Sequence, residues 1–137
     1  MCPVDEDPPA DSALLDPFDL PEWLVSEQVV WKALESVVAK SVVKGQLYAV
    51  DAAHAPFRLD LVAVDAAWPT AECSPQDRRA AHQAWHFGQV VVLRHDGVSA
   101  LGVPTALFSA DFTLEALRRF ARAVGSDPWR YAVHLLL

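Results

Sequence analysis

Residues 89–103 read QVVVLRHDGVSALGV, two apolar runs rich in β-branched residues that are joined by Asp96-Gly97. Asp-Gly favours a type I′ turn, because both central residues of that turn need a positive φ. The stretch therefore predicts a β-hairpin in which His95 lies opposite Val98. Both faces of this hairpin are apolar away from the turn, so we expect its strands to be central in a sheet and covered on both sides.

The elements around the hairpin predict an α+β fold. Residues 58–65 have the pattern of a strand, and residues 74–87 that of a helix with an N-cap and a proline at its start. A second helix is capped by Asp111 or Thr113, and residues 130–136 form the last strand. From about residue 58 the order is β-α-β-β-α-β, the split βαβ or ferredoxin-like order, which predicts a two-layer sandwich with both helices on one sheet face.

An extra helix and an extra strand precede this order. The apolar residues between Ser26 and Lys40 recur at helical spacing and Ser26 supplies an N-cap, so the segment is predicted as a helix. Its many valines lower helix propensity, and residues 29–31 are alternatively a short strand. Residues 42–50 are predicted as a strand in which Gly45 marks a bulge or a close approach.

Charge is distributed unevenly along the chain. The net charge is −7, and seven of the 18 acidic residues lie in residues 1–22, which contain no Lys or Arg. The remainder carries eleven acidic residues against 11 basic ones, so it lacks the basic surface that nucleic-acid binding needs. With five prolines in its first 21 residues, the chain divides into an acidic, Pro-rich tail (1–21) and a single α+β domain (22–137).

Several functional classes are disfavoured by composition. No apolar run approaches the roughly 18 residues of a membrane span, and the acidic beginning is the opposite of a signal peptide. Cys2 and Cys73 are the only cysteines and imply no disulfide framework. The five glycines are not clustered, so no phosphate-binding loop is predicted. We expect a cytoplasmic protein with no cofactor and with neither nucleic acid nor membrane as a partner.

The sequence offers one candidate metal site. His82 and His86 are four residues apart on a predicted helix, so both project from one face, and Cys73 lies just before that helix. The zinc-protease motif needs a glutamate directly after the first histidine, and Gln83 stands there. The alternatives are a site that takes a fourth ligand from elsewhere in the chain, or two surface histidines.

Two groups of side chains are candidate binding residues. One is a set of large apolar residues in an acidic background, which is typical of docking segments but also fits packing on the chain's own core. The other is a basic cluster on the last helix, either a solvated face or a patch that receives the acidic tail. The six residues are Phe18, Trp23, Leu24, Arg118, Arg119 and Arg122.

No serine nucleophile with histidine and aspartate partners is recognisable, so no catalytic residue is assigned and enzymatic activity is left open. Two helices on one face would leave the other face of an apolar sheet uncovered. Either a second copy or an N-terminal segment of the same chain should cover that face. We therefore expect a non-enzymatic interaction module that forms a homo-oligomer through this open apolar face or binds a protein partner. The alternative is a small metal-binding protein or enzyme that uses Cys73, His82 and His86.

Overall fold

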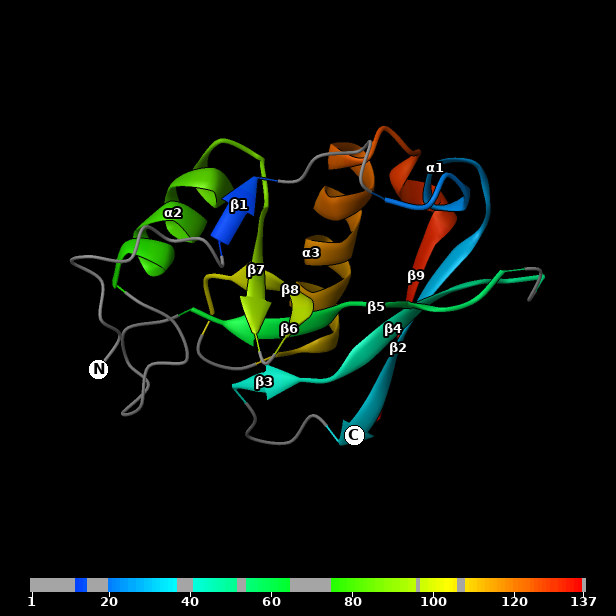
Figure 1. Cartoon of the computed structure of the whole chain (residues 1–137), viewed down its shortest axis with the longest axis horizontal. Coiled ribbons are helices and arrows are strands. Elements are labelled where there is room, and N and C mark those ends of the chain that lie inside the picture. Colours follow the sequence, from blue (N-terminus) through cyan, green and yellow to red (C-terminus); the bar gives the residue numbers. More distant parts are fainter. Residues whose placement is uncertain are drawn as a thin grey trace.

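The computed structural model describes residues 12–14, 20–36, 41–51, 54–64, 75–95, 97–105 and 108–136. Its elements are β1 (Ser12–Leu14), α1 (Trp23–Ser26), β2 (Val29–Ser36), β3 (Val42–Val43), β4 (Gly45–Ala49), β5 (Phe57–Arg58), β6 (Asp60–Ala63), α2 (Pro75–His86), β7 (Val91–His95), β8 (Val98–Val103), α3 (Ala110–Ala123), the 3-10 turn η2 (Pro128–Arg130) and β9 (Tyr131–Leu136). They form a mixed α+β fold with two sheets, of strand order β1-β7-β8-β6-β3 and β5-β4-β2-β9 (Figure 1). No helix among the described residues is both long enough and apolar enough to cross a membrane.

The predicted hairpin is confirmed as β7 and β8. His95 lies opposite Val98, and Gly97 has a φ of +80°, as the turn requires. Asp96 lies outside the described residues. Both strands are interior to the first sheet, because β1 pairs antiparallel with β7 and β6 pairs parallel with β8.

Both faces of the first sheet are buried within this chain. On one face, Ala81 and Ala84 of α2 pack against Val62 and Leu93. On the other face, a larger core joins the sheet to α3 and to the second sheet: Leu61, Leu101, Leu117, Phe120, Val29 and Trp31 all belong to it and are fully buried. The expectation that both helices share one sheet face is therefore wrong, and the other face is covered by α3 and by the second sheet, which contains β2 and β4 from the first half of the chain.

The specific ferredoxin-like order is not confirmed. In a split βαβ unit, two parallel strands flank a third strand. Here β6 and β7 flank β8, but β6 is parallel to β8 while β7 is antiparallel to it, so the flanking strands run in opposite directions. The place beyond β6 is taken by β3, and β9 lies in the other sheet.

The helix predicted between Ser26 and Lys40 is wrong. The helix α1 ends at Ser26 after one turn, and β2 occupies residues 29–36, while residues 37–40 lie outside the described residues. Burial alternates along the start of this strand, because Val29 and Trp31 are fully buried and Lys32 is exposed. The β-branched and aromatic side chains fit this pleated, half-buried position better than a helix, so the alternative strand prediction is correct and extends further.

One bent antiparallel hairpin links the two sheets. Its first arm is β3 followed by β4 and its second arm is β5 followed by β6; β3 pairs with β6 in the first sheet, and β4 pairs with β5 in the second. The arms change sheets at Lys44 and Leu59, and the N–H of Leu59 donates to the carbonyl of Gly45 there (3.1 Å). Strands that pass from one sheet to another at a bend form the corner of such a fold.

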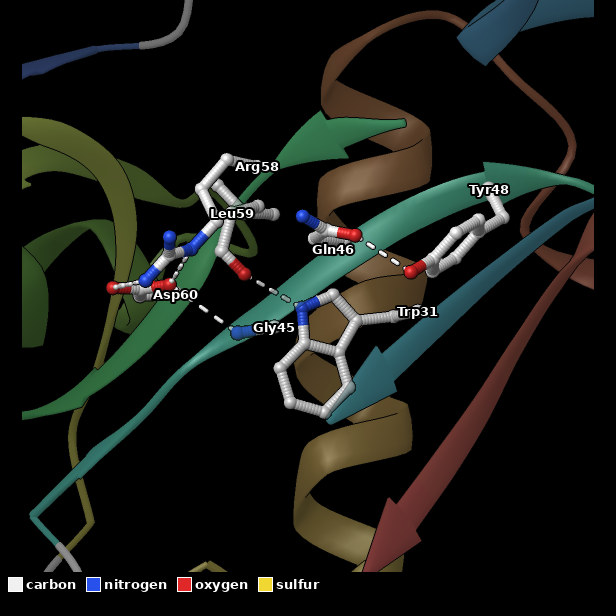
Figure 2. A network of polar contacts seen from close by, with 7 residues as sticks. All are labelled: Trp31, Gly45, Gln46, Tyr48, Arg58, Leu59 and Asp60. Atoms are coloured by element: carbon white, nitrogen blue, oxygen red, sulfur yellow. Dashed lines mark hydrogen bonds and ion pairs between the residues drawn. The ribbon is translucent and has the colours of Figure 1, made fainter. Parts of the chain in front are cut away.

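A buried polar network holds this corner (Figure 2). The carboxylate of Asp60, only 2% exposed, accepts hydrogen bonds from Arg58 Nε at 2.6 Å and from the N–H of Gly45 at 3.2 Å. The indole N–H of Trp31 donates to the carbonyl of Leu59 at 2.7 Å. A Cβ at Gly45 would lie 2.1 Å from Trp31 Cζ2, which confirms the close approach predicted at this glycine.

Candidate functional site

The helix α3 and the strand β9 lie against each other and run in opposite directions. The helix begins at its cap Ser109, whose hydroxyl accepts a hydrogen bond from the N–H of Phe112 at 3.1 Å. It is followed by Gly125, at a φ of +87°, and by η2, which turns the chain into β9. The Phe120 and Tyr131 rings are in contact, with centroids 6.2 Å apart. The start of β9 therefore lies beside the C-terminal end of α3.

The start of β9 is fixed by a long-range contact. The hydroxyl of Tyr131 donates a hydrogen bond to the carbonyl of Leu24 at 2.6 Å, and both residues are buried. Burial raises the pKa of Tyr131 well above its usual value of 10.0, so this hydroxyl stays protonated. The guanidinium of Arg130 also donates to the carbonyl of Ser26. These contacts hold β9 in one position against β2 and α3.

The strand β9 is an edge strand. Its only sheet partner among the described residues is β2, which runs parallel to it (Figure 1). On an edge strand, alternate N–H and C=O groups point away from the sheet and are free to pair with another chain. Edge strands that avoid such pairing carry lysines or prolines, and residues 131–136 contain neither. The outer edge of β9 is therefore suited to receive a further strand.

An open groove of about 740 Å³ runs along this edge. One wall is α3 and the other is β9, with one residue of β2. The residues that line it are Ala110, Asp111, Leu114 and Arg118 of α3, Tyr131, Ala132, Val133, His134 and Leu135 of β9, and Val30. An apolar trough beside the edge of a sheet is the arrangement that binds an extended polypeptide.

The helical wall has a charge at each end. Asp111, Leu114 and Arg118 are spaced i, i+3 and i+7, so they form one stripe along α3 with an acid, an apolar centre and a base. Because β9 runs back along α3, Arg118 lies near the Tyr131 end of the groove and Asp111 near the Leu135 end. The Nε atom of Arg118 is buried and has no hydrogen-bond partner among the described residues.

Of the predicted apolar binding residues, two belong to the chain's own core. Leu24 is fully buried and Trp23 is 8% exposed, stacked on the ring of His54 with centroids 5.6 Å apart. Phe18 lies outside the described residues. The packing of Trp23 and Leu24 corresponds to the alternative in which these side chains complete the core.

The three predicted arginines have different surroundings on α3. Arg119 stacks over the Trp85 ring, 3.8 Å from its centroid, and donates to the carbonyl of Trp85 at 2.6 Å. Arg118 lies over the ring of Trp129, 4.3 Å from its centroid, at the groove. Arg122 is exposed. Of the three, Arg118 is the one that lines the groove.

The predicted metal ligands are only partly covered by the structure. His82 and His86 are exposed on α2, and His82 Nε2 lies 3.3 Å from the carbonyl of Val64. Cys73 lies outside the described residues, so the three-residue site stays a prediction. Within the described ranges, no group of three or more His, Cys, Asp or Glu side chains is placed to hold a metal.

Sequence reasoning missed the groove although it predicted the helix and the last strand. The signal available in the sequence was the stripe Asp111, Leu114 and Arg118 at helical spacing, beside a final strand without lysine or proline. Comparisons of the chain with protein-family models, with curated proteins and with solved structures find no match.

Proposed function

We propose that this chain is a non-enzymatic interaction module of the cytoplasm, and that it binds an extended polypeptide segment as an additional strand on β9. The observation that carries the proposal is the groove along β9, which has a sheet partner on only one side among the described residues and lies beside the apolar side chains of Leu114 and Val133. Main-chain hydrogen bonds would give affinity, and the groove would select side chains.

The sequence favoured self-association through an open apolar sheet face. Both faces of the first sheet are covered by α2 on one side and by α3 and the second sheet on the other, so that surface is not offered for binding. We therefore propose the edge of β9, and not a sheet face, as the binding surface. A strand of about five residues adds several main-chain hydrogen bonds, each worth about 0.5–1.5 kcal/mol net, and apolar contacts in the groove must supply the rest of the binding free energy.

A peptide selection tests the proposed function. Random 12-residue peptides displayed on phage are selected on the purified chain, and fluorescence polarisation then measures the Kd of labelled hits. We expect Leu114→Glu, which places a charge in the groove, to weaken binding at least tenfold. The matched control is Phe87→Glu: this side chain is 69% exposed at the end of α2, outside the groove, and its replacement should leave the Kd within twofold.

Hydrogen exchange distinguishes strand addition from other modes of binding. A bound peptide that adds to β9 should slow amide exchange at alternate residues of 131–136, because only the outward N–H groups gain a partner. The proposed function is refuted if the chain selects no peptide and also stays monomeric, if hits bind Leu114→Glu as tightly as the wild type, or if β9 exchange is unchanged on binding.

A further inference from the structure

We infer that the strand added to β9 is the β9 of a second copy of this chain, and that the two copies form a symmetric antiparallel pair in which Arg118 of each faces the partner's Asp111. This inference rests on the proposed function and names the partner for the same groove. It follows from the direction of the elements and from the charges along α3.

The geometry brings opposite charges together. When two β9 strands pair antiparallel about a twofold axis, the Tyr131 end of one lies beside the Leu135 end of the other. Arg118 lies at the Tyr131 end of its own groove and Asp111 at the Leu135 end. The twofold therefore places each Arg118 near the partner's Asp111 and brings the two Leu114 side chains together at the centre.

The spacings along helix and strand agree. Seven residues of α3 separate Asp111 from Arg118, a rise of about 10.5 Å. Residues 131–135 of β9 span about 13 Å, a similar length. Directly opposed side chains of an antiparallel pair share a face, so the twofold axis must pass at a residue, and a register centred on Val133 places Tyr131 opposite the partner's Leu135. This one register pairs the strands and brings the oppositely charged ends of the two helices together.

Charge complementarity favours a second copy over an unrelated peptide. A uniformly acidic segment would be repelled by Asp111, and a uniformly basic one by Arg118. A second copy in the inverted orientation presents the opposite charge at both ends. It also supplies an acceptor for the guanidinium of Arg118, whose buried Nε has no hydrogen-bond partner among the described residues. In the paired strands, Ala132 and His134 of one copy lie near the same residues of the other, so no two carboxylates and no two lysines face each other.

Charge reversal tests this arrangement. Sedimentation velocity over about 1–500 µM, at 50 mM salt, should show the wild type passing from the 15.0 kDa monomer to a species of twice that mass. Arg118→Asp opposes two acids at both contacts, and Asp111→Arg opposes two bases, so each variant alone should dimerise at least tenfold more weakly. Mixing the two variants restores both Arg–Asp contacts in a heterodimer, which should form with an affinity within about threefold of wild type.

Matched controls separate this effect from general charge effects. Arg122→Asp and Glu22→Arg make the same charge changes at exposed positions that do not line the groove, and both should dimerise like the wild type. Urea unfolding of each variant shows whether it is folded, so that weaker dimerisation is not mistaken for loss of folding. Recovery of dimerisation in the mixture is a second check that both variants are folded.

The outcomes separate the inference from the proposed function. A wild-type chain that stays monomeric up to 500 µM, or a dimer unaffected by both charge reversals, overturns the inference. A mixture that associates no better than either variant alone also overturns it. If the chain is monomeric but selected peptides bind in a manner sensitive to Leu114→Glu, the groove is a peptide site and only the identity of the partner is wrong.

Discussion

Replacing Gly45 by alanine tests how the two sheets are joined. Alanine in place of a strand glycine ordinarily stabilises a protein by about 0.5–1 kcal/mol, because it reduces the freedom of the unfolded chain. At Gly45 we expect the opposite sign. The new Cβ would lie 2.1 Å from Trp31 Cζ2 and 2.3 Å from Cε2, far inside van der Waals contact.

The size of the destabilisation follows from the displacement of the Trp31 ring that the new Cβ requires. The Trp31 ring is fully buried and held by its 2.7 Å hydrogen bond to the Leu59 carbonyl. Overfilling a packed core costs about 1–3 kcal/mol, and leaving a buried carbonyl without its donor costs about 1–3 kcal/mol more. We therefore expect Gly45→Ala to lower the free energy of unfolding by about 2–6 kcal/mol, a large part of the roughly 5–15 kcal/mol of a typical domain.

The assay is urea unfolding at pH 7 followed by far-UV circular dichroism. The matched control is Gly102→Ala, in β8, where the nearest atom to a Cβ is the flexible end of Leu93 at 3.2 Å, so the change should stay within about 1 kcal/mol. In a Trp31→Leu background the indole atoms are absent, and Gly45→Ala should cost little. A Gly45→Ala variant that unfolds at the wild-type urea concentration or above it would refute the reasoning.

Two further predictions concern single contacts. Tyr131→Phe leaves the buried Leu24 carbonyl without its donor and should lower the free energy of unfolding by about 1–3 kcal/mol at pH 7. Because burial raises the pKa of Tyr131 in the folded state, the contribution of the tyrosine is complete below the unfolded pKa of about 10 and declines as the pH rises above it. In urea unfolding, the difference in stability between variant and wild type should therefore narrow above pH 10, and a constant difference would contradict this. Arg119→Lys keeps the charge but loses the stack on the Trp85 ring and the hydrogen bond to the Trp85 carbonyl. It should lower the urea midpoint by the equivalent of about 1–2 kcal/mol, whereas Arg122→Lys, at an exposed position, should change it by less than about 0.5 kcal/mol. Equal effects of the two substitutions would contradict this prediction.

Local chemistry made part of the fold predictable. The Asp-Gly pair set the hairpin register, and the glycines at 88 and 125, both at positive φ, follow the ends of α2 and α3, where a glycine commonly ends a helix. The start of α3 was predicted less well, because its cap is Ser109 and not Asp111 or Thr113. These features depend on neighbours within a few residues.

Partners distant in sequence were not predictable in the same way. The pattern of residues 131–136 identifies a strand but does not say whether it joins β6 or β2, and only the structure shows that it joins β2. Residues 29–36 carry apolar groups on both faces of the strand, so a helical period fits them nearly as well as a period of two. Arg118 was recognised as a candidate residue, but its relation to Asp111 and to an edge strand depends on that long-range pairing.

The contact between Tyr131 and Leu24 joins residues separated by 107 positions, and β9 pairs with β2 across a similar span. During synthesis at about 5–20 residues per second, roughly 5–20 s pass between the appearance of these two partners at the ribosome. Until then β2 has no neighbour on its β9 side, and the apolar side chains of Trp23 and Leu24 lack the strand that closes over them. The nascent chain should therefore be a client for chaperones that shield apolar segments until translation of β9 is complete.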